Sequence, residues 1–96
     1  MEKGGYIYIL TNKTNKVLYT GVTSNLTNRL FQHRTDHFKN AFTSRYNVSK
    51  LVYFEEFHSI EDAISREKQL KAGSRQKKID LIEGINPEWT DLSGSC

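Results

Sequence analysis

The chain has 96 residues, which allows one small domain with a thin hydrophobic core. Hydrophobic residues make up 36% of it and charged residues 26%, with a formal net charge of +3, so the composition argues against wholesale disorder. The apolar runs are too short to span a membrane, and the one cysteine, Cys96, excludes an internal disulfide framework and a multi-cysteine zinc site. Because no segment near the N-terminus resembles a secretion signal, we expect a cytoplasmic protein.

Two strands joined by a hairpin are predicted at the start of the chain. Residues 6–10 and 17–22 are rich in aromatic and β-branched side chains, which favour strands. The polar, asparagine-rich stretch between them suits a tight turn. With the two-residue period of a strand, Tyr6 and Tyr8 share one face of the first strand.

A helix is predicted next, capped by Ser24 or Asn25 and running to about residue 37. Residues 50–57 follow as a third strand, and they carry an apolar run over 51–54 without polar alternation. Such a run is typical of a strand that is covered on both faces, so we expect this strand at the centre of the sheet.

Two further helices are predicted in the second half of the chain. Ser59 begins a capping sequence for a helix that runs to residue 72, and Ser74 caps a shorter helix that runs to residue 84. A turn then follows, and Trp89 is expected to fold back and close the core.

This order of elements predicts an α+β fold. We expect a small three-stranded, mostly antiparallel sheet flanked by three helices. One domain should cover residues 1–92, and residues 93–96 should form a frayed C-terminal tail.

Basic residues gather in two segments that contain few acids. Residues 29–50 hold one acid, Asp36, and residues 66–78 hold one acid, Glu67, while the other acids lie elsewhere. Such segments are either solvated polar faces or a footprint for phosphate groups.

Glu67 is unusual because it falls on the apolar stripe of its predicted helix. Ile60, Ala63 and Ile64 define that stripe, and helical spacing places Glu67 near its centre. A carboxylate is rarely buried without a partner, because its desolvation is costly. Either Glu67 pairs with an arginine at the edge of the stripe, or it is held in a site as a metal ligand or an acid–base group.

The first helix shows a related pattern with the opposite charge. His33 lies on the apolar stripe of that helix, one turn after Arg29. His33 is either a core histidine with a satisfied hydrogen bond or part of a site. The two helices are expected to place Arg29, His33 and Glu67 toward the same sheet, where Tyr8 and Tyr19 lie on adjacent strands.

Taken in chain order, these residues resemble the motifs of the GIY-YIG nuclease superfamily, in particular its small stand-alone bacterial members. The resemblance covers residues 5–92. It rests on Tyr6-Ile7-Tyr8, Tyr19-Thr20-Gly21, Arg29, His33, the helix residues from Ala63 to Glu67, and the ending Asn86-Pro87-Glu88-Trp89. Tyr6 stands where the name-giving glycine would be, and Val22 stands where some relatives carry a lysine.

The resemblance implies a GIY-YIG fold and a divalent-metal-dependent DNA endonuclease that acts in DNA repair or processing. It implies that Glu67 holds Mg²⁺ or Mn²⁺, that Arg29 neutralises the scissile phosphate, and that Tyr8, Tyr19 or His33 takes the proton of the attacking water. Which of the three is the base stays open. Four basic residues would hold the DNA backbone without base specificity: Lys71, Arg75, Lys77 and Lys78.

Two alternatives remain open from the sequence. In the first, the domain is a non-catalytic nucleic-acid-binding module. In the second, it is a nuclease subunit whose activity depends on a protein partner. In each case the expected partner is DNA, branched or structured DNA included, and no membrane association is expected.

Overall fold

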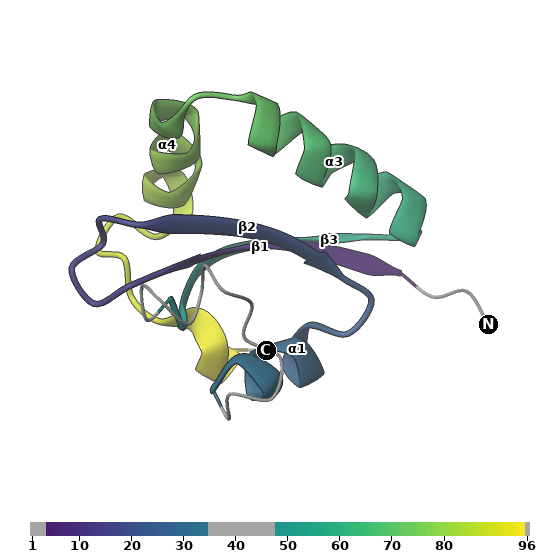
Figure 1. Cartoon of the computed structure of the whole chain (residues 1–96), viewed down its shortest axis with the longest axis horizontal. Coiled ribbons are helices and arrows are strands. Elements are labelled where there is room, and N and C mark those ends of the chain that lie inside the picture. Colours follow the sequence, from purple (N-terminus) through teal and green to yellow (C-terminus); the bar gives the residue numbers. More distant parts are fainter. Residues whose placement is uncertain (1–3, 35–47, 96) are drawn as a thin grey trace.

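The computed structural model describes residues 4–34 and 48–95, with the side chains of residues 32–34 and 95 left outside the described part. Its elements are β1 (Gly5–Thr11), β2 (Leu18–Thr23), α1 (Leu26–Arg34), β3 (Lys50–Phe57), α3 (Ile60–Ala72), α4 (Arg75–Ile85) and the 3₁₀ helix η1 (Leu92–Ser95). Helices α3 and α4 cover one face of the three-stranded sheet, and α1 and η1 lie on the other (Figure 1). The predicted α+β fold is confirmed.

The strand order is β2-β1-β3, with both neighbours of β1 antiparallel to it. The prediction that the third strand is central was therefore wrong, because β1 holds that position. The outer edge of β3 is nevertheless covered: the amide Nδ2 of Asn86 donates to the Val52 carbonyl at 3.1 Å, and the Leu51 N–H donates to Asp91 Oδ1 at 3.3 Å. Side chains from the C-terminal segment thus satisfy an edge that another strand would otherwise occupy.

Two hydrophobic clusters lie on the two faces of the sheet. Ile7 and Ile9 of β1 pack with residues of α3 and α4, and the alternate residues Tyr8 and Leu10 pack with residues of α1. Tyr6 joins the second cluster, which confirms that it shares a face with Tyr8. The strand period therefore directs Tyr8 away from α3.

The helix caps follow the predicted polar residues. Asn25 caps α1 by accepting the N–H of residue 28 at 3.0 Å, and Ser59 and Ser74 each accept a backbone N–H at 3.2 Å to begin α3 and α4. The last helix ends one residue later than predicted, at Ile85. Trp89 is buried against the α3–α4 cluster, as predicted.

The end of the chain differs from the prediction. Residues 92–95 form the short helix η1, where the sequence indicated a frayed tail, and Leu92 packs against the cluster on the α1 face. This apolar contact gives the end of the chain a place on the core. Cys96 lies outside the described residues. Across the described ranges, the helices are all too short or too polar to cross a membrane.

Candidate active site

The candidate site is built around a close approach between Tyr8 of β1 and Gly21 of β2. These two residues face each other in the antiparallel register. A Cβ atom on Gly21 would lie 2.4 Å from both Cζ and the hydroxyl oxygen of Tyr8, closer than atoms can approach. Glycine therefore makes the room that the Tyr8 ring occupies.

A second tyrosine lies beside the first. Tyr8 is fully buried and Tyr19 is half-buried, and their ring centroids are 6.5 Å apart with the planes inclined by 46°. This tilted arrangement is typical of paired aromatic side chains. The two strands thus bring both predicted tyrosines to one place on the α1 face of the sheet.

Arg29 joins the tyrosines from α1. Burial raises the pKa of Tyr8 above its usual value of 10, and the guanidinium of Arg29 opposes that rise by favouring the charged phenolate. The rise from burial is larger, so the pKa of Tyr8 stays raised. The Tyr8 hydroxyl is accordingly protonated at neutral pH.

Glu67 approaches from the opposite layer. It lies on α3, and its carboxylate is one of the causes that raise the pKa of Tyr8, which places it within electrostatic range of that hydroxyl. Both helices pack on the same sheet, as predicted, but α1 and α3 cover its opposite faces, so Arg29 and Glu67 come from different sides. Since β2 is an edge strand, side chains from both layers can approach each other around it.

The burial of α3 supports part of the predicted stripe. Ala63 is fully buried, but Ile64 is 38% exposed, so Ile64 is not part of the packed face. Glu67 has 13% of its side chain exposed, and Leu70 is buried one turn later. The packed face therefore runs through residues 60, 63, 67 and 70, and Glu67 is indeed within it.

Glu67 has a partner that the sequence interpretation missed. Lys71 Nζ lies 2.7 Å from Glu67 Oε2, one helical turn away, and the Lys71 side chain is 55% exposed. The predicted alternative was a pair with an arginine. The i, i+4 spacing of a glutamate followed by a lysine was the available signal for this pair.

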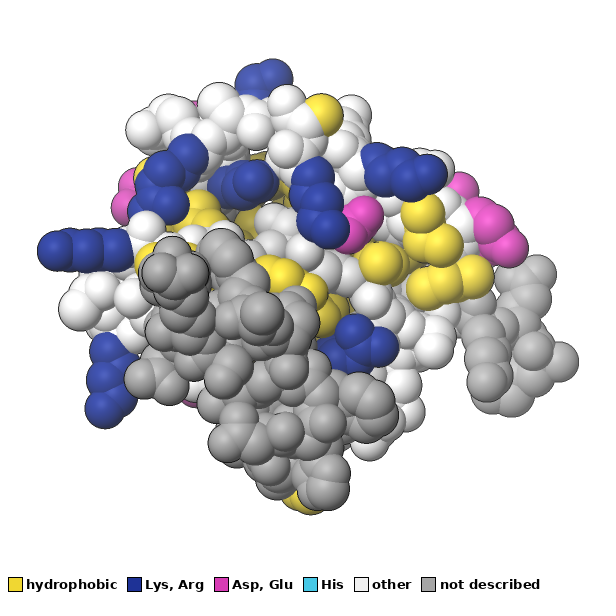
Figure 2. Space-filling model, viewed as in Figure 1, with side chains coloured by type: hydrophobic (Ala, Val, Ile, Leu, Met, Phe, Trp, Pro, Cys, Tyr) yellow, Lys and Arg dark blue, Asp and Glu magenta, His cyan; other side chains and the backbone are white. Residues whose placement is uncertain are grey.

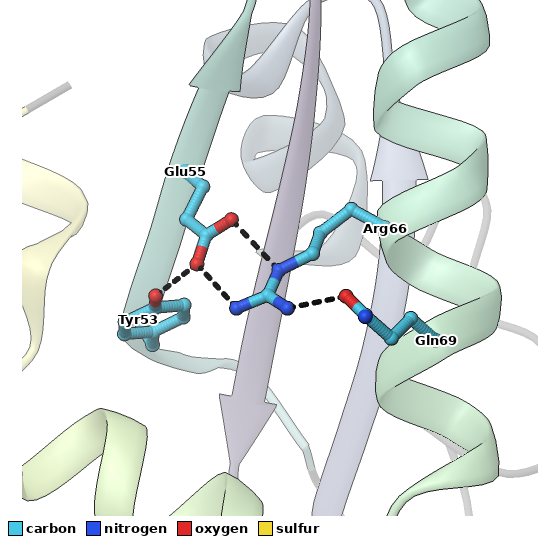
Figure 3. Close-up of polar contacts among 4 residues, drawn as sticks. All are labelled: Tyr53, Glu55, Arg66 and Gln69. Atoms are coloured by element: carbon cyan, nitrogen blue, oxygen red, sulfur yellow. Dashed lines mark hydrogen bonds and ion pairs between the residues drawn. The ribbon is translucent and has the colours of Figure 1, made fainter.

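A second carboxylate on the α3 side is held much more firmly (Figure 3). Arg66 donates to both oxygens of Glu55, each at 3.1 Å, and the Tyr53 hydroxyl donates to Glu55 Oε2. Arg66 also donates to Gln69 Oε1 at 2.5 Å. Burial alone would raise the pKa of Glu55, but the hydrogen bonds from Arg66 and Tyr53 outweigh it and lower that pKa.

The four basic residues predicted to bind DNA have different surroundings. Lys71 contacts Glu67, Arg75 Nη2 donates to the carbonyl of Lys16 at 2.6 Å, and Lys77 lines a pocket of about 360 Å³ between α3 and α4. Lys78 is half-buried. Lys and Arg side chains nevertheless form an arc over α4 and α3 on the face seen in Figure 2.

One carboxylate near Tyr8 fits a cation that takes most of its ligands from water and substrate phosphate. The described residues hold no cluster of three or more His, Cys, Asp or Glu side chains. Glu67 is the carboxylate that acts on the Tyr8 hydroxyl, so it is the candidate ligand here. Mg²⁺ is often bound by one or two carboxylates together with water and substrate phosphates. Thr20 lies on the α3 side of β2, between Leu18 and Val22. Its hydroxyl is buried and has no hydrogen-bond partner among the described residues. His33 lies in α1, but its side chain is outside the described part.

Comparison with known proteins matches this geometry to a family. Residues 4–80 match the GIY-YIG catalytic domain. The chain belongs to the GIY-YIG nuclease superfamily. GIY-YIG nucleases generally use divalent metal ions, and the domain implies binding of a DNA substrate.

The relatives are small proteins of similar length. A UPF0213 protein of Syntrophus aciditrophicus is 39% identical over 83 residues, which cover 86% of this chain and 93% of the relative. A UPF0213 protein of Pediococcus pentosaceus is 38% identical over 89 residues, covering 93% and 92%. The solution NMR structure of the UPF0213 protein BH0048 from Bacillus halodurans matches with a TM-score of 0.57, 28% identity and 93% coverage of each chain. These names state no reaction, so the functional argument depends on the family and the site.

Proposed function

We propose that this chain is a divalent-metal-dependent DNA endonuclease that hydrolyses phosphodiester bonds in DNA repair or processing. The observation that carries the proposal is the convergence of groups from both layers at Gly21. Two tyrosines and Arg29 lie on one side of the sheet, and Glu67 reaches the same tyrosine from the other. A cation-binding carboxylate and a guanidinium beside the same hydroxyl are the groups that phosphodiester hydrolysis requires.

Arg29 and Glu67 have separate roles in this proposal. When bound, Mg²⁺ or Mn²⁺ polarises the phosphate and lowers the pKa of a ligated water. Glu67 would hold that ion with one carboxylate, and substrate phosphate and water would complete its ligands. Arg29 would bind the scissile phosphate through its planar guanidinium and neutralise the charge that develops on the phosphate oxygens.

The raised pKa of Tyr8 bears on the choice of base. In the metal-free chain, burial keeps the Tyr8 hydroxyl protonated, which suits donation of a hydrogen bond and does not suit removal of a proton from water. Tyr19 is less buried. Histidine is the residue type that ordinarily exchanges a proton near neutral pH, which makes His33 a candidate. We therefore assign the base role to Tyr19 or His33 and a positioning role to Tyr8.

The basic side chains would hold the flanking DNA backbone. Arg75 and Lys78 belong to α4, the helix beside α3, and such contacts to phosphate give affinity without base specificity. Lys77 lies in the α3–α4 pocket with Arg66 and Asp80, so its contribution to backbone binding should be smaller. We propose DNA as the substrate and leave duplex, branched and structured forms to be compared directly.

One observation favours a second candidate, a nucleic-acid-binding module without catalysis. The Glu67 carboxylate is already neutralised by Lys71, as a purely structural ion pair would be. A nicking assay separates the two candidates. Purified chain should nick supercoiled plasmid and cleave branched oligonucleotides in Mn²⁺ or Mg²⁺, and it should bind both without cleavage in EDTA. Binding without cleavage in every metal would support the binding module, or a nuclease subunit that needs a protein partner.

A further inference from the structure

The ion pair between Glu67 and Lys71 combines two very different environments. The Glu67 side chain is 13% exposed, and the Lys71 side chain is 55% exposed, with 2.7 Å between Oε2 and Nζ. A nearly buried carboxylate is therefore neutralised by a side chain that is mostly in solvent. An i, i+4 pair of this kind stabilises a helix only weakly.

The other carboxylate on this side of the sheet shows what a permanent pair looks like. Glu55 receives two hydrogen bonds from Arg66 and one from Tyr53, and Arg66 is itself fixed by Gln69. Lys71, in contrast, is held in the described part of the chain by one ion pair at the end of a flexible stem, and its side chain is already 55% exposed. The Glu67–Lys71 pair is therefore held by fewer contacts than the Glu55–Arg66 pair.

We propose that Lys71 is the resident counter-cation of Glu67, and that it leaves the carboxylate for a DNA phosphate when a divalent cation binds there. This inference rests on the proposed function, in which Glu67 is the metal ligand. Two cations cannot share one carboxylate closely without repulsion, so an ammonium at 2.7 Å and a divalent ion compete for Glu67. The exchange keeps the carboxylate neutralised before metal arrives.

The exchange also couples metal to DNA. Without DNA, the displaced Lys71 ammonium has no phosphate to contact, and it opposes metal binding. With DNA present, a backbone phosphate takes the ammonium, so each ligand should favour the binding of the other. Because of Lys71, the chain is expected to bind metal weakly in the absence of DNA and more tightly in its presence.

The test is a Mg²⁺ titration of the whole chain without DNA. The amide chemical shifts of α3 are measured at each Mg²⁺ concentration and give the dissociation constant. The variants are Lys71→Gln, which removes the competing charge, and Lys71→Arg, which retains a cation at the same position. The matched control is Lys68→Gln, an equal charge change at an exposed position of the same helix. We expect Lys71→Gln to lower the Mg²⁺ dissociation constant about threefold or more, whereas Lys68→Gln changes it less than about twofold.

Four other outcomes would overturn the exchange. Equal effects of Lys71→Gln and Lys68→Gln would mean that only net charge matters. A higher dissociation constant for Lys71→Gln would make Lys71 a helper of metal binding and not a competitor. If Mg²⁺ shifts no amide near Glu67 in the parent or in any variant, the metal site of the proposed function is wrong, and the exchange is wrong with it. Binding in the parent without a specific Lys71 effect would contradict the exchange alone.

Discussion

Glu55 and Glu67 are two carboxylates on the α3 side of one small sheet, and they are held in opposite ways. Glu55 is the more exposed, at 25%, yet it receives three hydrogen bonds from Arg66 and Tyr53. Glu67 is the less exposed, at 13%, and among the described residues its ion-pair partner is one solvent-exposed lysine, Lys71. Judged by burial alone, Glu67 would be the carboxylate with the structural role. Judged by its partners, Glu67 is the carboxylate that can more easily bind another ligand.

The difference follows from the chemistry of the partners. The planar guanidinium of Arg66 binds both oxygens of the Glu55 carboxylate, and the Tyr53 hydroxyl adds a third hydrogen bond. The Lys71 ammonium, on a flexible stem, contacts one carboxylate oxygen of Glu67, Oε2, among the described residues. We interpret Glu55 as a structural residue that links β3 to α3, and Glu67 as the proposed metal ligand.

The largest effect is expected from Glu67→Gln. We expect metal-dependent cleavage to fall about 10³-fold or more, because the carboxylate that holds the ion is lost. The melting temperature should stay within about 2 °C of the parent, since an i, i+4 pair contributes little to stability. Nicking assays and thermal melts measure both. Glu61→Gln, an exposed glutamate on the same helix, is the control and should cleave at the parental rate.

A different pattern would reverse the interpretation of the two carboxylates. If Glu67→Gln unfolds the domain and metal binding by the remaining folded fraction is unchanged, Glu67 is the structural residue and the site assignment is wrong.

Arg66→Met is expected to lower stability and leave cleavage unchanged, the opposite of the effects expected for Glu67→Gln. It leaves the Glu55 carboxylate and the Tyr53 hydroxyl without their cation, which should lower the free energy of unfolding by about 2 kcal/mol. Cleavage per folded molecule should not change. Arg75→Met, which removes an exposed contact to a backbone carbonyl, should cost less than about 0.5 kcal/mol in a urea titration. Equal losses from the two variants would show that the Glu55 cluster is not special.

The smallest expected effect is in the pH dependence of stability. The folded-state pKa of Glu55 is below its usual 4.5, so its contribution is present above that pH and is lost as the pH falls through the lower, folded-state value. The folded-state pKa of Tyr53 is raised from 10 to about 12, so its contribution is present below pH 10 and is lost between pH 10 and about 12. Urea titrations at several pH values should show both slopes, and Arg66→Met should flatten the acidic one.

Much of the fold could be predicted because its signals are local. The hairpin, the caps Asn25, Ser59 and Ser74, and the shared face of Tyr6 and Tyr8 follow from residue type and the periods of strand and helix. The position of β3 could not be predicted, because Asn86 and Asp91 cover its edge from more than 30 residues away. An apolar run shows that both faces are covered and does not show which neighbour lies beside it.

The sequence predicts which residues belong to the candidate site, and it does not predict how they are arranged. Sequence motifs named Tyr8, Tyr19, Arg29 and Glu67, but no local pattern shows that α1 and α3 lie on opposite faces of the sheet. The partner of Glu67 was missed because the argument from burial called for an arginine, while a lysine at i+4 was sufficient.

The central claim is that Glu67, and not Glu55, is the carboxylate that binds the metal. Paramagnetic broadening by Mn²⁺ in amide NMR spectra tests it most directly, since the chain is small and broadening falls steeply with distance from the ion. We expect the broadening at low Mn²⁺ to centre on residues 66–71 of α3 and on β2 near Gly21, to vanish in Glu67→Gln, and to persist in Glu55→Gln. Broadening that centres on Tyr53 and Glu55, or that survives in Glu67→Gln, would contradict the account.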